Sequence, residues 1–146
     1  MFTKNRLELK QVVRRLEFDL NILIAEDNQF TAAQYDRILR KYGHSVTLTK
    51  DGSECIQTYQ EKLKRSEFES LDSSPFDVVV LDQSMPKMSG SEVATQILSN
   101  KPKQKIIFAS AYALSGSSDT KKLESKVEYL QKPFSLSAFV EKIHES

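Results

Sequence analysis

Five residues capable of chemistry stand at, or within two residues of, the end of a short apolar run: Glu26, Asp27, Asp82, Ser110 and Lys132. Short continuous apolar runs predict buried strands, and parallel strands present their carboxyl ends at one edge of a sheet. We therefore expect three acids, one hydroxyl and one lysine to share a single rim of the molecule.

These residue types at one rim predict phosphoryl chemistry. Two carboxylates about 5 Å apart repel by roughly 3 kcal/mol at an effective dielectric near 20, so three acids need a counter-charge. An all-oxygen ligand set suits Mg²⁺ best, and Mn²⁺ could substitute. With the cation and Lys132 offsetting charge, Asp82 could attack phosphorus while Ser110 donates to a phosphoryl oxygen. Taken singly, each residue has a plainer explanation as a cap, a turn residue or an exposed charge.

The elements that must position this rim alternate along the chain. Apolar runs at 22–25, 46–48, 78–81, 106–109 and 127–130 are separated by segments with helical spacing at 35–42, 55–63, 93–98 and 136–143. This alternation predicts an α/β fold, a doubly wound five-stranded parallel sheet with helices on both faces. Gly43 should end the first of these helices, while Asp51, Ser89 and Ser135 stand where the next three begin.

Three segments fit this alternation less simply. Residues 64–75 are polar and predict a helix end followed by a long exposed loop. Residues 114–126 are a poor helix where the architecture expects one. Residues 1–20 have apolar residues near helical spacing, which predicts an amphipathic helical extension before a domain at 21–146. That extension could pack on its own domain or form a dimer or inter-domain contact.

Composition narrows the function classes. A net charge of +1 over 146 residues, without a basic cluster interleaved with aromatics, argues against direct nucleic-acid binding. No run is long enough to span a membrane, and the single cysteine, Cys55, and the absence of an N-terminal apolar signal favour a reducing cytoplasm. His44 and His144 are isolated in the sequence and fit surface roles better than metal ligation.

Several motifs resemble one known family. They are Ala25-Glu26-Asp27-Asn28, Val80-Leu81-Asp82, Met85-Pro86-Lys87-Met88-Ser89-Gly90, Ala109-Ser110-Ala111 and Tyr129-Leu130-Gln131-Lys132-Pro133-Phe134. Together they resemble the CheY-like response-regulator receiver domain of two-component signal transduction, over about residues 21–145. The resemblance implies a flavodoxin-like sheet with strand order 2-1-3-4-5.

The resemblance also implies roles for the residues of the rim. Asp82 matches the phosphoacceptor, and Glu26 and Asp27 match the acidic pair that organises Mg²⁺. Asp27 and Asp82 are then direct ligands, with the backbone carbonyl of Ser84 as a third.

The remaining implied roles concern switching and phosphoryl lifetime. Ser110 matches the switch hydroxyl, Tyr129 the aromatic that turns inward with it, and Lys132 the family's lysine, followed by a cis bond to Pro133. Ser84 and Tyr112 occupy positions that tune phosphoryl lifetime in the family. Bulky Tyr112 could hinder attacking water, so we expect a fairly long-lived phosphate.

The resemblance implies a signalling role rather than turnover of a substrate. A sensor histidine kinase or a histidine phosphotransfer protein would donate phosphoryl from a phosphohistidine, and the receiver would catalyse only its own phosphorylation and slow dephosphorylation. The output face would comprise the fourth helix, fifth strand and fifth helix. A homodimer through that face or through the N-terminal helix is possible, and the downstream effector is not specified.

Other functions stay open at this point. The chain could be a stand-alone receiver or a segment of a larger hybrid histidine kinase. An aspartate-nucleophile phosphatase of the haloacid-dehalogenase type would want a second acid at position 84, where Ser84 stands. A flavin-binding electron carrier is disfavoured because the first strand runs into acids rather than an anion cradle. A degenerate, unphosphorylated scaffold is a further rival.

Overall fold

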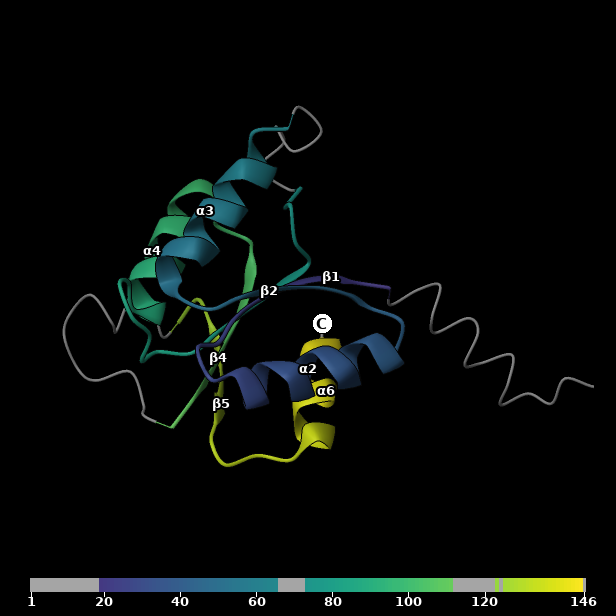
Figure 1. Cartoon of the computed structure of the whole chain (residues 1–146). Coiled ribbons are helices and arrows are strands. Elements are labelled where there is room, and N and C mark those ends of the chain that lie inside the picture. Colours follow the sequence, from purple (N-terminus) through teal and green to yellow (C-terminus); the bar gives the residue numbers. More distant parts are fainter. Residues whose placement is uncertain (1–18, 66–72, 112–122, 124, 146) are drawn as a thin grey trace, which may run out of the picture.

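A computed structural model describes residues 19–65, 73–111, 123 and 125–145 of the 146-residue chain. The predicted N-terminal helix, Tyr112 and most of the segment 114–126 lie outside these residues. Within them, five strands and four helices follow one another (Figure 1). Their bounds are β1 Asn21–Ala25, α2 Gln29–Lys41, β2 Ser45–Thr49, α3 Gly52–Leu63, β3 Val78–Leu81, α4 Gly90–Asn100, β4 Lys105–Ser110, β5 Glu128–Gln131 and α6 Leu136–His144.

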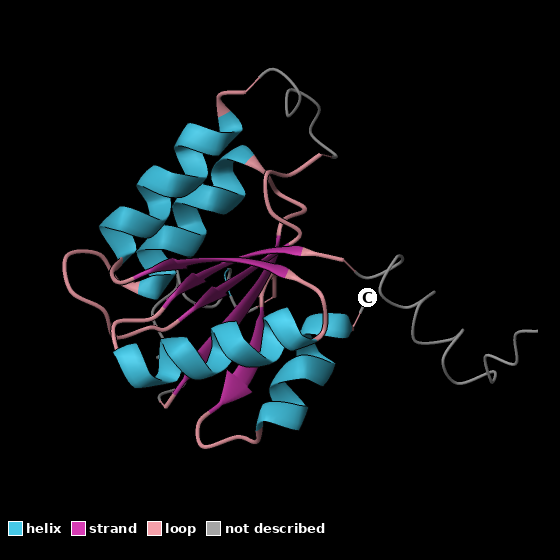
Figure 2. Cartoon of the chain, turned by 45° about the vertical axis from the view of Figure 1, so that its right-hand side comes forward, coloured by secondary structure: helices cyan, strands magenta, loops and turns pink. Residues whose placement is uncertain are grey.

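The sheet confirms the predicted doubly wound topology. All strand pairs are parallel and the strand order is β2-β1-β3-β4-β5. Figure 2 shows α3 and α4 on one face of the sheet, with α2 and α6 on the other. None of the helices in the described ranges is both long and apolar enough to cross a bilayer.

Two apolar layers fix the central strands because their side chains alternate between the two faces. Leu23 and Val79 pack with the helices α3 and α4, whereas Ile22 and Val80 pack with α2 and α6. All four residues of β3 are buried, as the continuous run in the sequence predicts. Each buried Val, Leu or Ile side chain contributes roughly 1.5–3 kcal/mol, so the middle of the sheet is a firm base for its rim.

The predicted helix starts are confirmed by capping contacts. The side chains of Asp51, Ser89 and Ser135 each accept a hydrogen bond from a backbone N–H in the first turn of α3, α4 and α6 respectively. Asn28 caps α2 in the same way. These caps begin each helix directly beside the carboxyl end of the preceding strand, at the rim that carries the acids.

The prediction of isolated surface histidines is wrong. His44 is buried, and its Nε2 lies 2.8 Å from Nε2 of His144 at the end of α6. The Nδ1 atom of His44 accepts a hydrogen bond of 3.1 Å from the backbone N–H of Leu20. The two histidines are 100 residues apart in the sequence, so only the tertiary fold brings them together.

Candidate functional site

The register of the central strands places the two main acids side by side. Ala25 of β1 pairs with Leu81 of β3, so Glu26 and Asp82 are the next residues on neighbouring strands. The N–H of Asp82 donates to the carbonyl of Ala25 at 3.2 Å, and the N–H of Glu26 donates to the carbonyl of Thr49 at 3.1 Å. The backbone of both acids is therefore still hydrogen-bonded to a neighbouring strand, which fixes where their side chains begin.

Three carboxylates converge at this point. Each of Glu26, Asp27 and Asp82 offers an oxygen, and these oxygens all lie within 4.8 Å of one another. In the described part of the chain, no other group of three acidic, histidine or cysteine side chains is close enough to share an ion. Glu26 is 4% exposed, whereas Asp27 is exposed to solvent. The cluster thus has a buried base and an open mouth.

Lys132 supplies the positive charge of the cluster. Its Nζ lies 2.8 Å from Oε1 of Glu26 and 3.7 Å from Oδ2 of Asp82. Its backbone N–H donates to the carbonyl of Ser110 at 2.9 Å, and the bond to Pro133 is cis, as expected. The lysine therefore reaches the acids from the far side of β4, at the end of β5.

The pKa values of the pair reflect their shared environment. Burial raises the pKa of Glu26, and the Lys132 ammonium opposes that rise. Burial alone would lower the pKa of Lys132, but Glu26 and Asp82 outweigh it, so its pKa is raised and the ammonium stays charged. Lys132 is therefore the fixed positive charge of a site that holds three carboxyl groups.

The other predicted residues differ in what the structure says about them. Ser110 is buried at the end of β4, and Tyr129 on β5 stacks on Phe108 with ring centroids 6.4 Å apart. Ser84 is exposed, and its N–H donates to Oδ1 of Asp82 at 3.4 Å. Tyr112 lies outside the described residues, so its predicted influence on phosphoryl lifetime stays a prediction.

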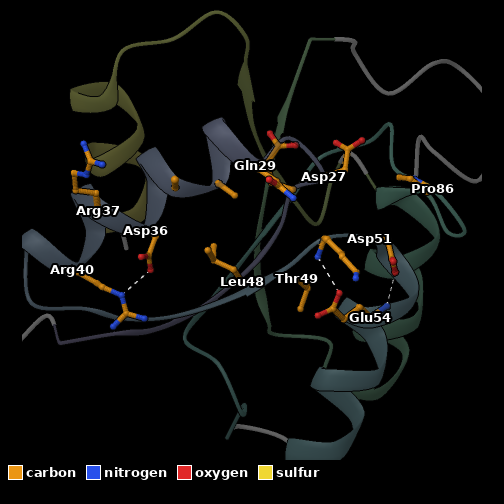
Figure 3. Close-up of a pocket in the computed structure, with 14 residues that line it drawn as sticks. Asp27, Gln29, Asp36, Arg37, Arg40, Leu48, Thr49, Asp51, Glu54 and Pro86 are labelled. Atoms are coloured by element: carbon orange, nitrogen blue, oxygen red, sulfur yellow. Dashed lines mark hydrogen bonds and ion pairs between the residues drawn. The ribbon is translucent and has the colours of Figure 1, made fainter.

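An open groove beside the acids was not foreseen from the sequence. It has a volume of about 1010 Å³ and runs between α2 and β2 from Asp27 toward Arg37 (Figure 3). Gln29, Ala33 and Arg37 of α2 line one side at helical spacing, and Leu48 of β2 lies opposite. The spacing on α2 is visible in the sequence, but the opposing strand is known only once the sheet order is known.

The donor set of the cluster fits a hard divalent cation. Carboxylate oxygens with room for water at an exposed mouth are the ligands that Mg²⁺ prefers, and neither histidine nor cysteine is part of the group. The structure brings together Glu26, Asp27, Asp82 and Lys132 as predicted from their places in the sequence. An acid at position 84, which a phosphatase of the haloacid-dehalogenase type would need, is absent from the sequence.

The family model of the response regulator receiver domain matches residues 22–144. A similar curated protein is the response regulator receiver protein CpdR of Brucella abortus, which is 28% identical over 124 residues, covering 85% of this chain and 93% of that protein. The hybrid signal transduction histidine kinase I of Dictyostelium discoideum is 31% identical over 117 residues. That match covers 77% of this chain but only 6% of the kinase.

Solved structures show the same fold. The receiver domain of the histidine kinase CKI1 from Arabidopsis thaliana, complexed with Mg²⁺ and BeF₃⁻, aligns with a TM-score of 0.70 at 22% identity. The alignment covers 92% of this chain and 96% of that one. The non-phosphorylated HemR receiver domain from Leptospira biflexa aligns with a TM-score of 0.66 at 25% identity, covering 86% and 95% of the two chains.

Proposed function

The chain belongs to the response regulator receiver domain family of two-component signalling, and we propose that it accepts a phosphoryl group on Asp82. The observation that carries the proposal is the convergence of three carboxylates with Lys132, whose Nζ lies 3.7 Å from Asp82. Receiver domains are signalling modules that pair with histidine kinases or phosphotransfer proteins. The donor proposed here is the phosphohistidine of such a partner.

The transfer step needs only one new bond and one broken bond. A carboxylate oxygen of Asp82 forms the P–O bond as the P–N bond of the phosphohistidine breaks, and the imidazole nitrogen leaves with the electron pair. Lys132 places a positive charge beside the incoming phosphoryl oxygens, and Ser110 is proposed to donate a hydrogen bond to one of them. The acid cluster and its lysine are thus suited to positioning and charge compensation.

Glu26, Asp27 and Asp82, with the backbone carbonyl of Ser84, are the groups proposed to hold Mg²⁺, and Mn²⁺ is expected to substitute. When bound, the cation supplies charge that offsets the repulsion between an anionic phosphoryl group and these carboxylates. Glu26, whose Oε1 lies 2.8 Å from Nζ of Lys132, holds the lysine beside the acid cluster.

Phosphorylation is proposed to act through Ser110 and Tyr129. Ser110 is drawn toward the new charge and Tyr129 turns further inward, which shifts a two-state population on the face that includes β5 and α6. The stacking of Tyr129 on Phe108 supports this because it holds the ring against β4, the strand that ends at Ser110. We propose that this face carries the signal to a downstream protein.

A receiver segment of a hybrid histidine kinase is a second candidate for the whole protein. It is favoured by alignments that cover nearly all of this chain but only a small part of the related protein. The peroxide stress-activated histidine kinase mak1 of Schizosaccharomyces pombe is 30% identical, and the alignment covers 93% of this chain and 8% of that kinase. The phosphoacceptor chemistry is the same in both cases. The transcript that encodes the chain distinguishes them.

The experiment that tests the proposed function is phosphorylation by a small donor. The protein is incubated with acetyl phosphate and Mg²⁺, and intact mass should increase by one phosphoryl group in the parent but not in Asp82→Asn. Asp36→Asn, which replaces a half-buried acid on α2 in an ion pair with Arg40, is the matched control and should be phosphorylated like the parent. Equal labelling of Asp82→Asn and the parent would overturn the assignment.

A further inference from the structure

Gln83, the residue directly after Asp82, uses its side-chain amide to grip the start of α4. Its Oε1 accepts a hydrogen bond of 2.8 Å from the N–H of Ser91, and its Nε2 donates to Oγ of Ser91 at 2.8 Å. A backbone N–H can only donate, so this pair of contacts fixes which end of the amide faces which atom. The amide therefore has one defined orientation.

The backbone of Gln83 holds the same helix. The N–H of Gly90 donates to the carbonyl of Gln83 at 3.2 Å, so Gln83 satisfies the first two N–H groups of α4. The third, from Glu92, donates to the capping hydroxyl of Ser89 at 3.3 Å. Helix N-termini leave such N–H groups without partners inside the helix, and here two of them are bonded to the neighbour of the reactive carboxylate.

Asp82 itself is in close contact with the same turn of α4. A Cβ built on Gly90 would lie 2.4 Å from the carbonyl oxygen of Asp82, so the helix approaches as closely as a glycine permits. The carboxylate is oriented from the other side, because the N–H of Ser84 donates to its Oδ1 at 3.4 Å. The backbone carbonyls of Asp82 and Gln83 thus both lie against the first residue of α4.

The helix is a firm anchor for these contacts. Val93, Ala94 and Ile97 of α4 are fully buried in the layer that α3 and α4 form on the sheet. A group fastened to the first turn of such a helix cannot shift independently of the core. The contacts between Gln83, Gly90 and Ser91, here called the Gln83 clamp, therefore restrain the segment that carries Asp82.

We propose that Gln83 is a positioning residue for the phosphoacceptor. Through Ser91 it holds Asp82 and the following turn where the Asp82 carboxylate faces Glu26 and Asp27, so that the three acids present one preformed cation site. The inference rests on the proposed function and deepens it, since the clamp acts on the cation and the phosphoryl group only through Asp82. Partners that orient a metal ligand typically change metal affinity by 10- to 100-fold when removed.

The test measures Mg²⁺ binding directly, by titration calorimetry, on the full chain. Gln83→Leu removes both amide contacts, and its Mg²⁺ dissociation constant should rise roughly tenfold. Ser91→Ala removes the contact of the Ser91 hydroxyl with Nε2 of Gln83, together with its longer contact of 3.4 Å with Oγ of Ser89, and keeps the N–H bond to Oε1. It should show a smaller rise, while the double variant should bind no more weakly than Gln83→Leu alone. Gln57→Leu changes an exposed glutamine of α3 and should leave the constant unchanged.

Urea unfolding without metal separates positioning from loss of structure. Gln83→Leu should keep a cooperative transition, and at saturating Mg²⁺ it should reach the parent's extent of phosphorylation by acetyl phosphate. Should Gln83→Leu not fold, Ser91→Ala decides, and unchanged Mg²⁺ affinity in that variant overturns the proposal. Parent-like affinity in a folded Gln83→Leu overturns it as well.

The outcomes also separate this proposal from the proposed function. A parent that binds Mg²⁺ but is never phosphorylated contradicts the proposed function, while the comparison of dissociation constants still tests the clamp. A phosphorylated parent whose Gln83→Leu variant binds Mg²⁺ equally well contradicts the clamp alone.

Discussion

Replacing Asp82 by asparagine should stabilise the metal-free protein. A carboxylate oxygen of Asp82 lies within 4.8 Å of one on Glu26 and of one on Asp27. The repulsion between Asp82 and each of these acids is therefore about 3.5 kcal/mol or more at an effective dielectric near 20. The attraction to Lys132 at 3.7 Å is about 4.5 kcal/mol on the same scale. The two repulsions together exceed the attraction, so Asp82→Asn should raise the free energy of unfolding by about 2.5 kcal/mol.

The assay is urea unfolding followed by circular dichroism, in EDTA at low salt and again with Mg²⁺. A ligand at 100 times its dissociation constant stabilises a protein by about 2.7 kcal/mol, so Mg²⁺ should remove or reverse the variant's advantage. Added sodium chloride should shrink the advantage measured in EDTA. Asp36→Asn, which removes only a surface ion pair, should change stability by less than about 1 kcal/mol. Parent and Asp82→Asn of equal stability in EDTA at low salt would refute the reasoning.

Three other predictions concern stability. Lys132→Met leaves buried Glu26 without its partner and should cost about 3–5 kcal/mol at pH 7.5. Because the pKa of Glu26 is raised and protonation removes the unpaired charge, the cost should shrink as the pH falls; urea midpoints over a series of pH values check this. Burial, and to a smaller extent the neighbouring His144, lowers the pKa of His44 in the folded protein. The unfolded chain therefore binds more protons below about pH 6.5, and the free energy of unfolding should fall as the pH drops. His44→Gln should make this fall less steep, and an unchanged slope would contradict the prediction. Gly90→Ala places a methyl group 2.4 Å from the carbonyl oxygen of Asp82 and should lower the free energy of unfolding by about 1–3 kcal/mol, measured by thermal or urea unfolding. A variant as stable as the parent would contradict this prediction.

Most of the fold follows from local patterns in the sequence. The run Val78–Leu81 is apolar without interruption because both faces of β3 are covered. The capping residues mark the helix starts because each bonds a backbone N–H only three residues further along the chain. The alternation of strands and helices then allows few topologies, and the observed parallel sheet is the expected one. The apolar run at 46–48 is shorter than the strand it marks: Ser45 and Thr49 extend β2 at its two ends because the ladder with β1 continues.

The site was predictable to the extent that it depends on strand ends. Glu26, Asp82 and Lys132 could be placed at one rim because each closes a strand, and the structure brings them within ion-pair distance. The grip of Gln83 on Ser91 gives no comparable signal, since a glutamine in a polar turn is unremarkable in the sequence. The hydrogen bond between His44 and His144 could not be predicted from the sequence either, because it depends on how the end of α6 packs beside the start of β2.

The bond between these histidines has a consequence for how the domain can be joined to other polypeptide. Leu20, before β1, and His144, at the end of α6, both contact His44. The polypeptide therefore enters and leaves the domain at the same place, beside the amino ends of the strands. The acids lie at the opposite, carboxyl ends of the strands. Domains with neighbouring entry and exit points tolerate insertion into longer proteins. A flanking module attached on either side would leave the phosphoacceptor face open to a visiting donor.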